Sequence, residues 1–161
     1  FQQTSYNMAN NQKIIHKCKY LSLKAVKIKE DILFNKKCLT SNVTPNYVQL
    51  NTKINSYAAI KTLNIAKRIW VKEEINSLYS KLNTINNLLQ DTKSELETNY
   101  HPETLEEINI YIQEWIHPIL KKKKETHAKK LNKLIQEQNQ NSKLTTVENN
   151  IEFYPNVKNF T

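Results

Sequence analysis

The chain has 161 residues, four of them proline and none of them glycine, and it carries a formal net charge of +9. This length suffices for one domain with a modest core or for an elongated helical structure. Tight β-hairpin turns and phosphate-binding loops normally need glycine at positive φ, so its absence argues against both. Asparagine is abundant and could take the left-handed positions at turns and helix ends. The positive charge favours a polyanionic partner or an acidic membrane surface.

Two cysteines, Cys18 and Cys38, are the only thiols of the sequence. We find neither the cationic and apolar pattern of a signal segment nor an apolar run long enough to cross a bilayer. We therefore expect free thiols in a reducing intracellular compartment, the nucleus or the cytoplasm.

The first predicted helix follows a polar stretch. Residues 1–12 carry no charge, and we expect them to form a disordered lead-in. In residues 13–40, apolar side chains recur every three or four positions with lysines between them, which predicts a basic helix. Its apolar positions are Ile14, Cys18, Leu21, Ala25, Ile28 and Ile32.

Residues 41–56 interrupt the helical pattern. Pro45 disfavours helical torsion angles at Thr44. The neighbouring residues include the turn formers Ser41, Asn42 and Asn46. We predict an irregular connector around Pro45.

Residues 57–140 contain the two strongest helical patterns. The first starts at Tyr57 and ends near Thr98, and its apolar residues alternate at intervals of four and three, typical of a coiled coil. They are Val71, Ile75, Leu78, Leu82, Ile85 and Leu89. After the break TNYHPET, the same spacing returns in Leu105, Ile108, Ile112, Trp115 and Ile119. A short connection between two such patterns predicts a long antiparallel helical hairpin, and the fold class is all-α.

Two prolines bear on the second arm of this hairpin. Pro102 suits the first position of a helix, because proline has no N–H to donate and its φ is already helical. Pro118 lies within the pattern, and we expect it to kink the helix or to split it near His117.

The hairpin has a consequence for charge. Acidic residues flank the turn near Tyr100, whereas lysines occupy the start of the first arm and the end of the second. Folding back would gather the lysines into one basic cluster that contacts backbone phosphates. The predicted contacts are Lys36, Lys37, Lys67, Arg68, Lys121, Lys122, Lys123, Lys124, Lys129, Lys130 and Lys133.

Two other interpretations of these charges stay open. The lysines could simply solvate a helical scaffold whose seams mediate homo-oligomerisation or partner docking. They could also face an acidic membrane, although membrane-surface helices carry a wider apolar face than these narrow seams.

The sequence offers no convincing catalytic or metal-binding set. His16, Cys18 and Cys38 lack the close-spaced ligand pairs of a zinc site, and no phosphate-binding loop is present. We therefore expect no enzyme activity, no cofactor and no metal. The aromatic residues divide into two groups: Trp70 and Trp115 near the seams, expected to be core or interface anchors, and four tyrosines that could stack on bases beside lysines, namely Tyr20, Tyr47, Tyr57 and Tyr154.

Three collinear stretches resemble one known family. They are CLTSNVTPNYVQL (38–50), WVKEEINSLYSKLNTINNLL (70–89), and HAKKLNKLIQEQ (127–138) followed by FYPNVKNFT (153–161). Together they are similar to the region that precedes the reverse transcriptase domain in Penelope-like retroelement proteins.

This resemblance implies a role for the whole chain. It would be the N-terminal helical extension of an RNA-directed DNA polymerase, some relatives of which also carry a GIY-YIG endonuclease. Such an extension would hold template RNA or an RNA–DNA hybrid against a downstream catalytic domain. Residues 141–161 would be the linker into that domain. The Tyr-x-Asp-Asp motif of the polymerase does not occur in the 161 residues of this sequence, so we expect no polymerase activity from them.

Overall fold

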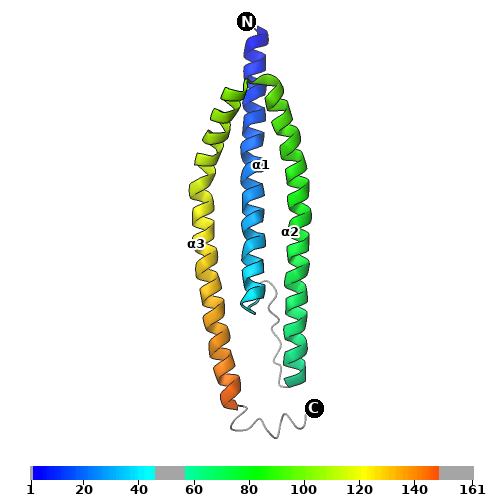
Figure 1. Cartoon of the computed structure of the whole chain (residues 1–161), viewed down its shortest axis with the longest axis vertical. Helices are drawn as coiled ribbons and strands as arrows, with labels where there is room; N and C mark the ends of the chain where they lie inside the picture. Colours follow the sequence, from blue (N-terminus) through cyan, green and yellow to red (C-terminus); the bar gives the residue numbers. More distant parts are fainter. Residues whose placement is uncertain (1, 46–56, 149–161) are drawn as a thin grey trace. The chain divides into compact units, whose positions relative to one another are not determined.

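The computed structural model describes residues 2–45 and 57–148, and within them the side chains of residues 10–45 and 64–139. These ranges contain three helices and no strand: α1 (Gln2–Thr40), α2 (Tyr57–Asn99) and α3 (Pro102–Glu148). Figure 1 shows the three helices along the chain. The predicted all-α fold is confirmed.

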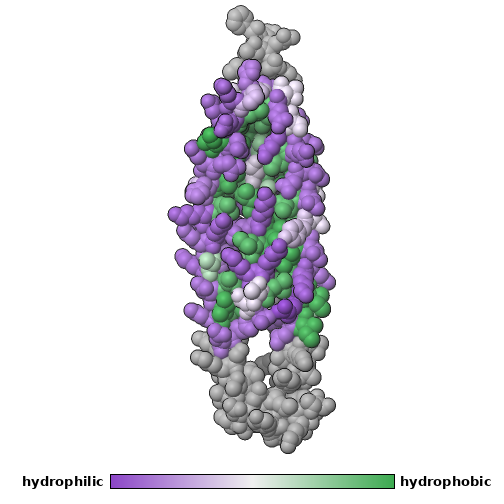
Figure 2. All heavy atoms as spheres, viewed as in Figure 1, coloured by the Kyte–Doolittle hydropathy of each residue, from purple (hydrophilic) through white to green (hydrophobic). Residues whose placement is uncertain are grey.

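The chain divides into two compact units, and each helix contributes to both. Unit 1 consists of Phe1–Ile32 and Ser77–Glu125, and unit 2 consists of Leu33–Asn76 and Thr126–Thr161. On the face shown in Figure 2, apolar residues gather between the helices and hydrophilic residues cover their outer sides.

Unit 1 has a core to which all three helices contribute. Ile14 and Cys18 of α1 are buried in one cluster with residues of the other two helices, Leu96, Ile112 and Ile116. These positions belong to the apolar patterns of the sequence or, like Ile116, lie beside them. Because α1 enters this core, the two arms of the hairpin do not bury their seams against each other alone.

Contacts along α1 define the direction of the helices in unit 1. At one end, Asn99 of α2 donates a hydrogen bond to Asn11 over 3.0 Å. Further along, Lys19 reaches Tyr111, and Asp31 pairs with Lys123 over 2.9 Å. Contact positions increase together on α1 and α3, so these helices run parallel, and α2 runs antiparallel to both (Figure 1).

The turn between α2 and α3 lies where the sequence predicts it. The amide of Tyr100 donates to the carbonyl of Leu96 at the end of α2, and that of Leu105 donates to His101. Pro102 is the first residue of α3, as predicted from its missing N–H.

Unit 2 has a second core around the C-terminal end of α1. Phe34 and Cys38 of α1 are buried with Val43, which follows the helix, and with Leu134 of α3. Leu131 and Ile135 of α3 pack against the same group. These three apolar residues of α3 lie beyond Pro118, so the part of α3 after the proline packs in unit 2.

The end of α1 is closed by a Schellman motif. The amide of Val43 donates to the carbonyl of Cys38 and that of Asn42 donates to Leu39, which is the hydrogen-bond pattern of this motif. Asn42 has a φ of 55°. Helices usually place glycine at this left-handed position, and in a chain without glycine the substitute is asparagine. Val43 and Cys38 also make the apolar contact that accompanies the motif.

Two predicted boundaries, the start of α1 and the end of α3, differ from the structure. Residues 1–12 are not a disordered lead-in over most of their length, because α1 already begins at Gln2. Residues 141–148 are not part of a linker, because α3 continues to Glu148. Neither stretch contains glycine or proline, so an established helix can propagate through it at little cost. The rest of the predicted linker, residues 149–161, and the connector residues 46–56 lie outside the described residues.

Pro118 does not split α3. The helix is continuous from Pro102 to Glu148, with Pro118 inside it. Proline removes one backbone hydrogen bond and crowds the preceding turn. Ile112 and Ile116, just before it, are buried in the core of unit 1, and their packing stabilises the helical conformation there.

Candidate nucleic-acid interface

The net charge of the chain is concentrated in unit 2. By sequence, unit 1 contains twelve lysines and no arginine against ten aspartates and glutamates, a net charge of +2. Unit 2 contains twelve lysines and arginines against five acidic residues, a net charge of +7. Polyanions are attracted to such a field, and the attraction falls as salt is added.

Acidic residues surround the α2–α3 turn of unit 1. Six exposed carboxylates occupy the end of α2 and the first turns of α3: Asp91, Glu95, Glu97, Glu103, Glu106 and Glu107. Lys93 is the basic residue among them. This end of unit 1 would repel a phosphate backbone.

The predicted phosphate contacts are divided between the two units. Lys121, Lys122, Lys123 and Lys124 belong to unit 1, and the other seven belong to unit 2. Three of these four are exposed, whereas Lys123 is partly buried and forms an ion pair with Asp31 over 2.9 Å. Lys123 therefore links α3 to α1 and is a weaker candidate for binding a ligand.

In unit 2, basic residues from all three helices lie at the end of α1. Arg68 of α2 donates hydrogen bonds to the carbonyl of Leu39 and to the side-chain oxygen of Asn42. Its positive charge thus lies at the negative end of the helix dipole of α1. Lys130 of α3 lies 5.6 Å from the ring centroid of Phe34.

His127 completes this group. Its ring stacks on Phe34, with 4.3 Å between centroids and an interplanar angle of 17°. The aromatic pair joins α3 to α1, and Lys130 lies one turn further along α3. No local sequence pattern indicates this contact of His127, because its partner Phe34 is far away in the chain.

We define the basic cluster of unit 2 as Lys36, Lys37, Lys67, Arg68, Lys129, Lys130 and Lys133. Lys37 lies in the last turn of α1, and it is exposed, as are Lys129 and Lys133 of α3. Lys129 and Lys133 are four residues apart and share one side of their helix. Arg68 and Lys130 are already held by neighbouring groups, so Lys129 and Lys133 are better candidates than these two for contact with phosphates.

The cysteines are not positioned for chemistry. Both are buried free thiols. Burial raises the pKa of the Cys38 thiol to about 11, although the nearby charge of Lys130 acts against this. Burial also raises the pKa of Cys18, against a hydrogen bond from Ser22 and the charge of Lys93. Raised pKa values keep both thiols protonated at neutral pH, which disfavours nucleophilic attack and metal binding.

Among the described residues, no group of three or more His, Cys, Asp or Glu side chains is arranged to hold a metal ion. None of the helices there is both long and apolar enough to cross a membrane.

The contact of two aromatic rings of α3 with one lysine of α1 was not predicted from the sequence. Tyr111 is exposed on α3, and Trp115, one turn later, packs partly against the core of unit 1. Both rings contact Lys19 of α1. The i, i+4 spacing of the two aromatic residues was a signal in the sequence, but their shared cation comes from another helix.

Comparison with known proteins finds no matching family model, no matching curated protein and no matching solved structure.

Proposed function

We propose that this chain is a non-catalytic helical module that binds RNA or an RNA–DNA hybrid through backbone phosphates. The observation that carries the proposal is the concentration of positive net charge in unit 2. Exposed lysines of α1 and α3 contribute to this charge. Affinity should therefore depend steeply on salt and weakly on nucleotide sequence.

The biological setting comes from the resemblance to Penelope-like retroelement proteins. In that setting the chain is an intracellular extension that precedes a reverse transcriptase domain and helps to retain the template or the hybrid. The downstream domain of the same polypeptide would be its second partner.

A charge-matched comparison tests phosphate binding. Lys129→Gln combined with Lys133→Gln removes two exposed charges from unit 2, and Lys81→Gln combined with Lys93→Gln removes two exposed charges from α2 in unit 1. We expect the first pair to weaken binding of a labelled RNA–DNA hybrid and to reduce the slope of log K against log salt by about one per lysine. The second pair should change both quantities much less.

Two results would count against the proposal. Wild-type protein that does not bind the hybrid at low salt would exclude it. Equal losses in both charge-matched variants would mean that only the total charge matters and that unit 2 holds no site.

A helical scaffold is the second candidate, and one observation favours it. Ile65 and Ile69 of α2 are 53% and 48% exposed, and they lie one turn apart on the same side of the helix in unit 2. An exposed apolar pair of this kind suits docking of a partner or of a second copy. Analytical ultracentrifugation of the wild type and of Ile65→Ser with Ile69→Ser would reveal an oligomer that depends on this pair.

A further inference from the structure

The outer side of α1 in unit 1 carries lysines and a tyrosine that the basic cluster of unit 2 does not include. Residues 1–29 contain six lysines and no acidic residue. Three of these lysines are exposed between the first described side chains and the middle of the helix: Lys13, Lys17 and Lys24. Lys13 and Lys17 lie near the acidic turn, because Asn11 of the same helix contacts Asn99. Lys24 lies further along α1, so it is better placed to attract phosphates.

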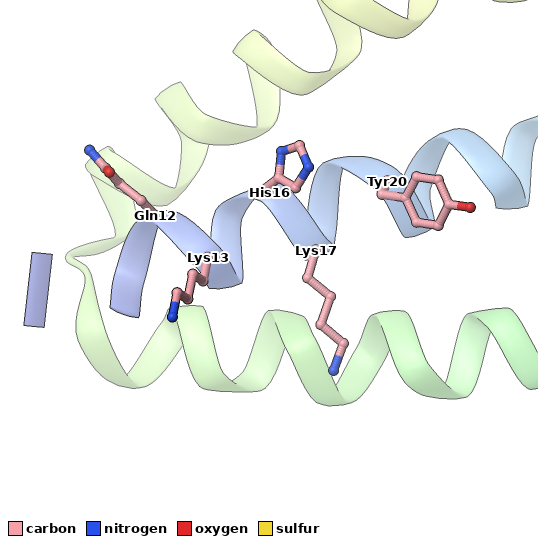
Figure 3. A pocket seen from close by; sticks show the side chains of 5 residues that line it. All are labelled: Gln12, Lys13, His16, Lys17 and Tyr20. Carbon is pink, nitrogen blue, oxygen red and sulfur yellow. The ribbon is translucent and has the colours of Figure 1, made fainter. Parts of the chain in front are cut away.

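A shallow, open surface patch lies on this side of α1. Gln12, Lys13, His16, Lys17 and Tyr20 line it. Figure 3 shows that Lys13 and Lys17 extend to one side of the helix, whereas Gln12 and His16 point to the other. Tyr20 follows His16 by one helical turn, so an aromatic ring stands at one end of a row of polar and cationic groups.

Two tyrosine rings in this region are both exposed and next to a cation. Tyr20 is 52% exposed, and the ammonium nitrogen of Lys24 lies 4.9 Å from its ring centroid. Tyr111 of α3 is 55% exposed, and the ammonium nitrogen of Lys19 lies 5.1 Å from its centroid. Lys19 also lies 4.1 Å from the centroid of Trp115 and donates a hydrogen bond to the Tyr111 hydroxyl over 3.4 Å.

The two rings belong to neighbouring helices at the same level of unit 1. Lys19, which contacts Tyr111, directly precedes Tyr20 in α1, and α1 and α3 run parallel here. A cation lies over each ring, and each tyrosine residue remains about half exposed. Exposed aromatic rings beside lysines are the elements with which proteins bind single-stranded nucleic acid, because every base has a flat face that can stack.

We infer that unit 1 binds unpaired nucleotides on the tyrosine–lysine surface, which we define as Lys19, Tyr20, Lys24 and Tyr111. Bases stack on the two tyrosines, and the lysines neutralise the phosphates between them. The inference rests on the proposed function and narrows it to a nucleic acid with a single-stranded portion. A duplex keeps its base faces inside the stack and cannot use the rings.

An anionic membrane fits this surface less well. Tyrosine is also found at membrane interfaces, but a helix that lies on a membrane inserts a broad apolar face. On the outer side of α1, the neighbours of Tyr20 along the helix are His16, Lys17 and Lys24, which are polar or charged. The apolar residues of this helix segment are turned into the core of unit 1.

The test compares binding of a labelled oligouridine with binding of an RNA duplex of equal length at low salt. In the full chain, Tyr20→Ala combined with Tyr111→Ala should weaken oligouridine binding by about tenfold or more, since each lost stacking contact has a substantial effect. Duplex binding should change less than about twofold, because it depends on phosphates.

Control variants separate stacking from other effects. Tyr20→Phe combined with Tyr111→Phe retains the rings and should retain oligouridine affinity. Tyr79→Ala removes an exposed tyrosine of α2 in the same unit and should leave both affinities unchanged. Circular dichroism melting of every variant shows whether the fold is preserved.

A measurement without any tyrosine substitution provides a second readout. Trp70→Phe leaves Trp115 as the single tryptophan of the chain. Because Trp115 and Tyr111 share Lys19, a base stacked on Tyr111 would change the emission of Trp115. Oligouridine should quench this emission and the duplex should not.

The outcomes distinguish the inference from the proposed function. If the tyrosine pair affects neither ligand or both equally, while the Lys129 and Lys133 variant still weakens binding, the inference is wrong and the proposed function stands. If the wild type binds neither ligand, or binds only anionic phosphatidylserine vesicles, both are wrong.

Discussion

The two units use the same three helices for different purposes. Unit 1 buries residues of all three helices in one cluster and is nearly balanced in charge, with its carboxylates near the α2–α3 turn. Unit 2 has a smaller cluster around the end of α1 and carries most of the positive charge. A repeating apolar pattern can therefore continue along a helix while the outer face of that helix changes its charge. Packing and ligand attraction depend on different faces, so they can vary independently.

The core of unit 1 offers the largest expected effect. Ile116 is 1% exposed in the cluster of three helices. Ile116→Ala should lower the free energy of unfolding by about 2–5 kcal/mol, through lost burial and the cavity left behind. Ile110→Ala on the same helix, at a position 49% exposed, should cost less than about 0.5 kcal/mol. Urea unfolding followed by circular dichroism measures both. Similar losses for the two variants would contradict the core assigned to unit 1.

A smaller effect concerns the buried thiols, one in each unit. Because burial raises the pKa of Cys38 from 9.0 to about 11, the folded state favours the protonated thiol. The resulting stabilisation is complete below pH 9 and is lost as the pH rises from about 9 to 11, and it amounts to about 2–3 kcal/mol. The difference in unfolding free energy between the wild type and Cys38→Ala should therefore fall over this range, while other titrating groups cancel.

Cys18 of unit 1 provides a second buried thiol with which to compare Cys38. A hydrogen bond from Ser22 and the charge of Lys93 partly offset the effect of burial on its pKa. Cys18→Ala should consequently show a weaker dependence on alkaline pH than Cys38→Ala. A pH-independent difference for Cys38→Ala would mean that the thiol of unit 2 ionises as freely in the folded state as in the unfolded state.

The smallest expected effect is at the end of α1 in unit 2. Arg68→Ala removes the hydrogen bonds to Leu39 and Asn42 and the positive charge at the helix C-terminus, and it should cost about 1 kcal/mol. Lys67→Ala removes a positive charge at the neighbouring position and should lower the free energy of unfolding by less than Arg68→Ala does. In an Asn42→Gly background the cost of Arg68→Ala should shrink, because one of its two acceptors is already gone. An unchanged cost in that background would show that the contact with Asn42 contributes nothing to stability.

Much of the fold could be predicted because the signals for it are local. The start of α2 at Tyr57 and of α3 at Pro102, and the burial of Val71, Leu78 and Leu82, follow from apolar spacing and from proline. Periodicity could not identify the partner of each seam. Ile14 and Cys18 were recognised as one side of a helix, but their packing against Ile112 and Ile116 depends on tertiary contacts.

The candidate site was less predictable than the fold. The sequence locates every lysine, but it does not tell which cations are held by the protein itself. Lys123 pairs with Asp31, Arg68 caps α1 and Lys130 lies over the ring of Phe34, so these predicted phosphate contacts have structural partners. The contact between Tyr111 and Lys19 could likewise not be predicted from the sequence, because the two residues are 92 positions apart.

The helical fold, the start of two helices and the excess of positive charge can all be predicted from the amino-acid sequence. The helices and their starts depend on neighbours within a few turns, through apolar spacing, proline and the lack of glycine. Three further features are visible only in the folded chain: α1 shares the core of unit 1, asparagine closes α1 beside Arg68, and Tyr111 contacts Lys19. Each of these depends on residues brought together from distant parts of the chain, and local patterns carry no information about such pairs.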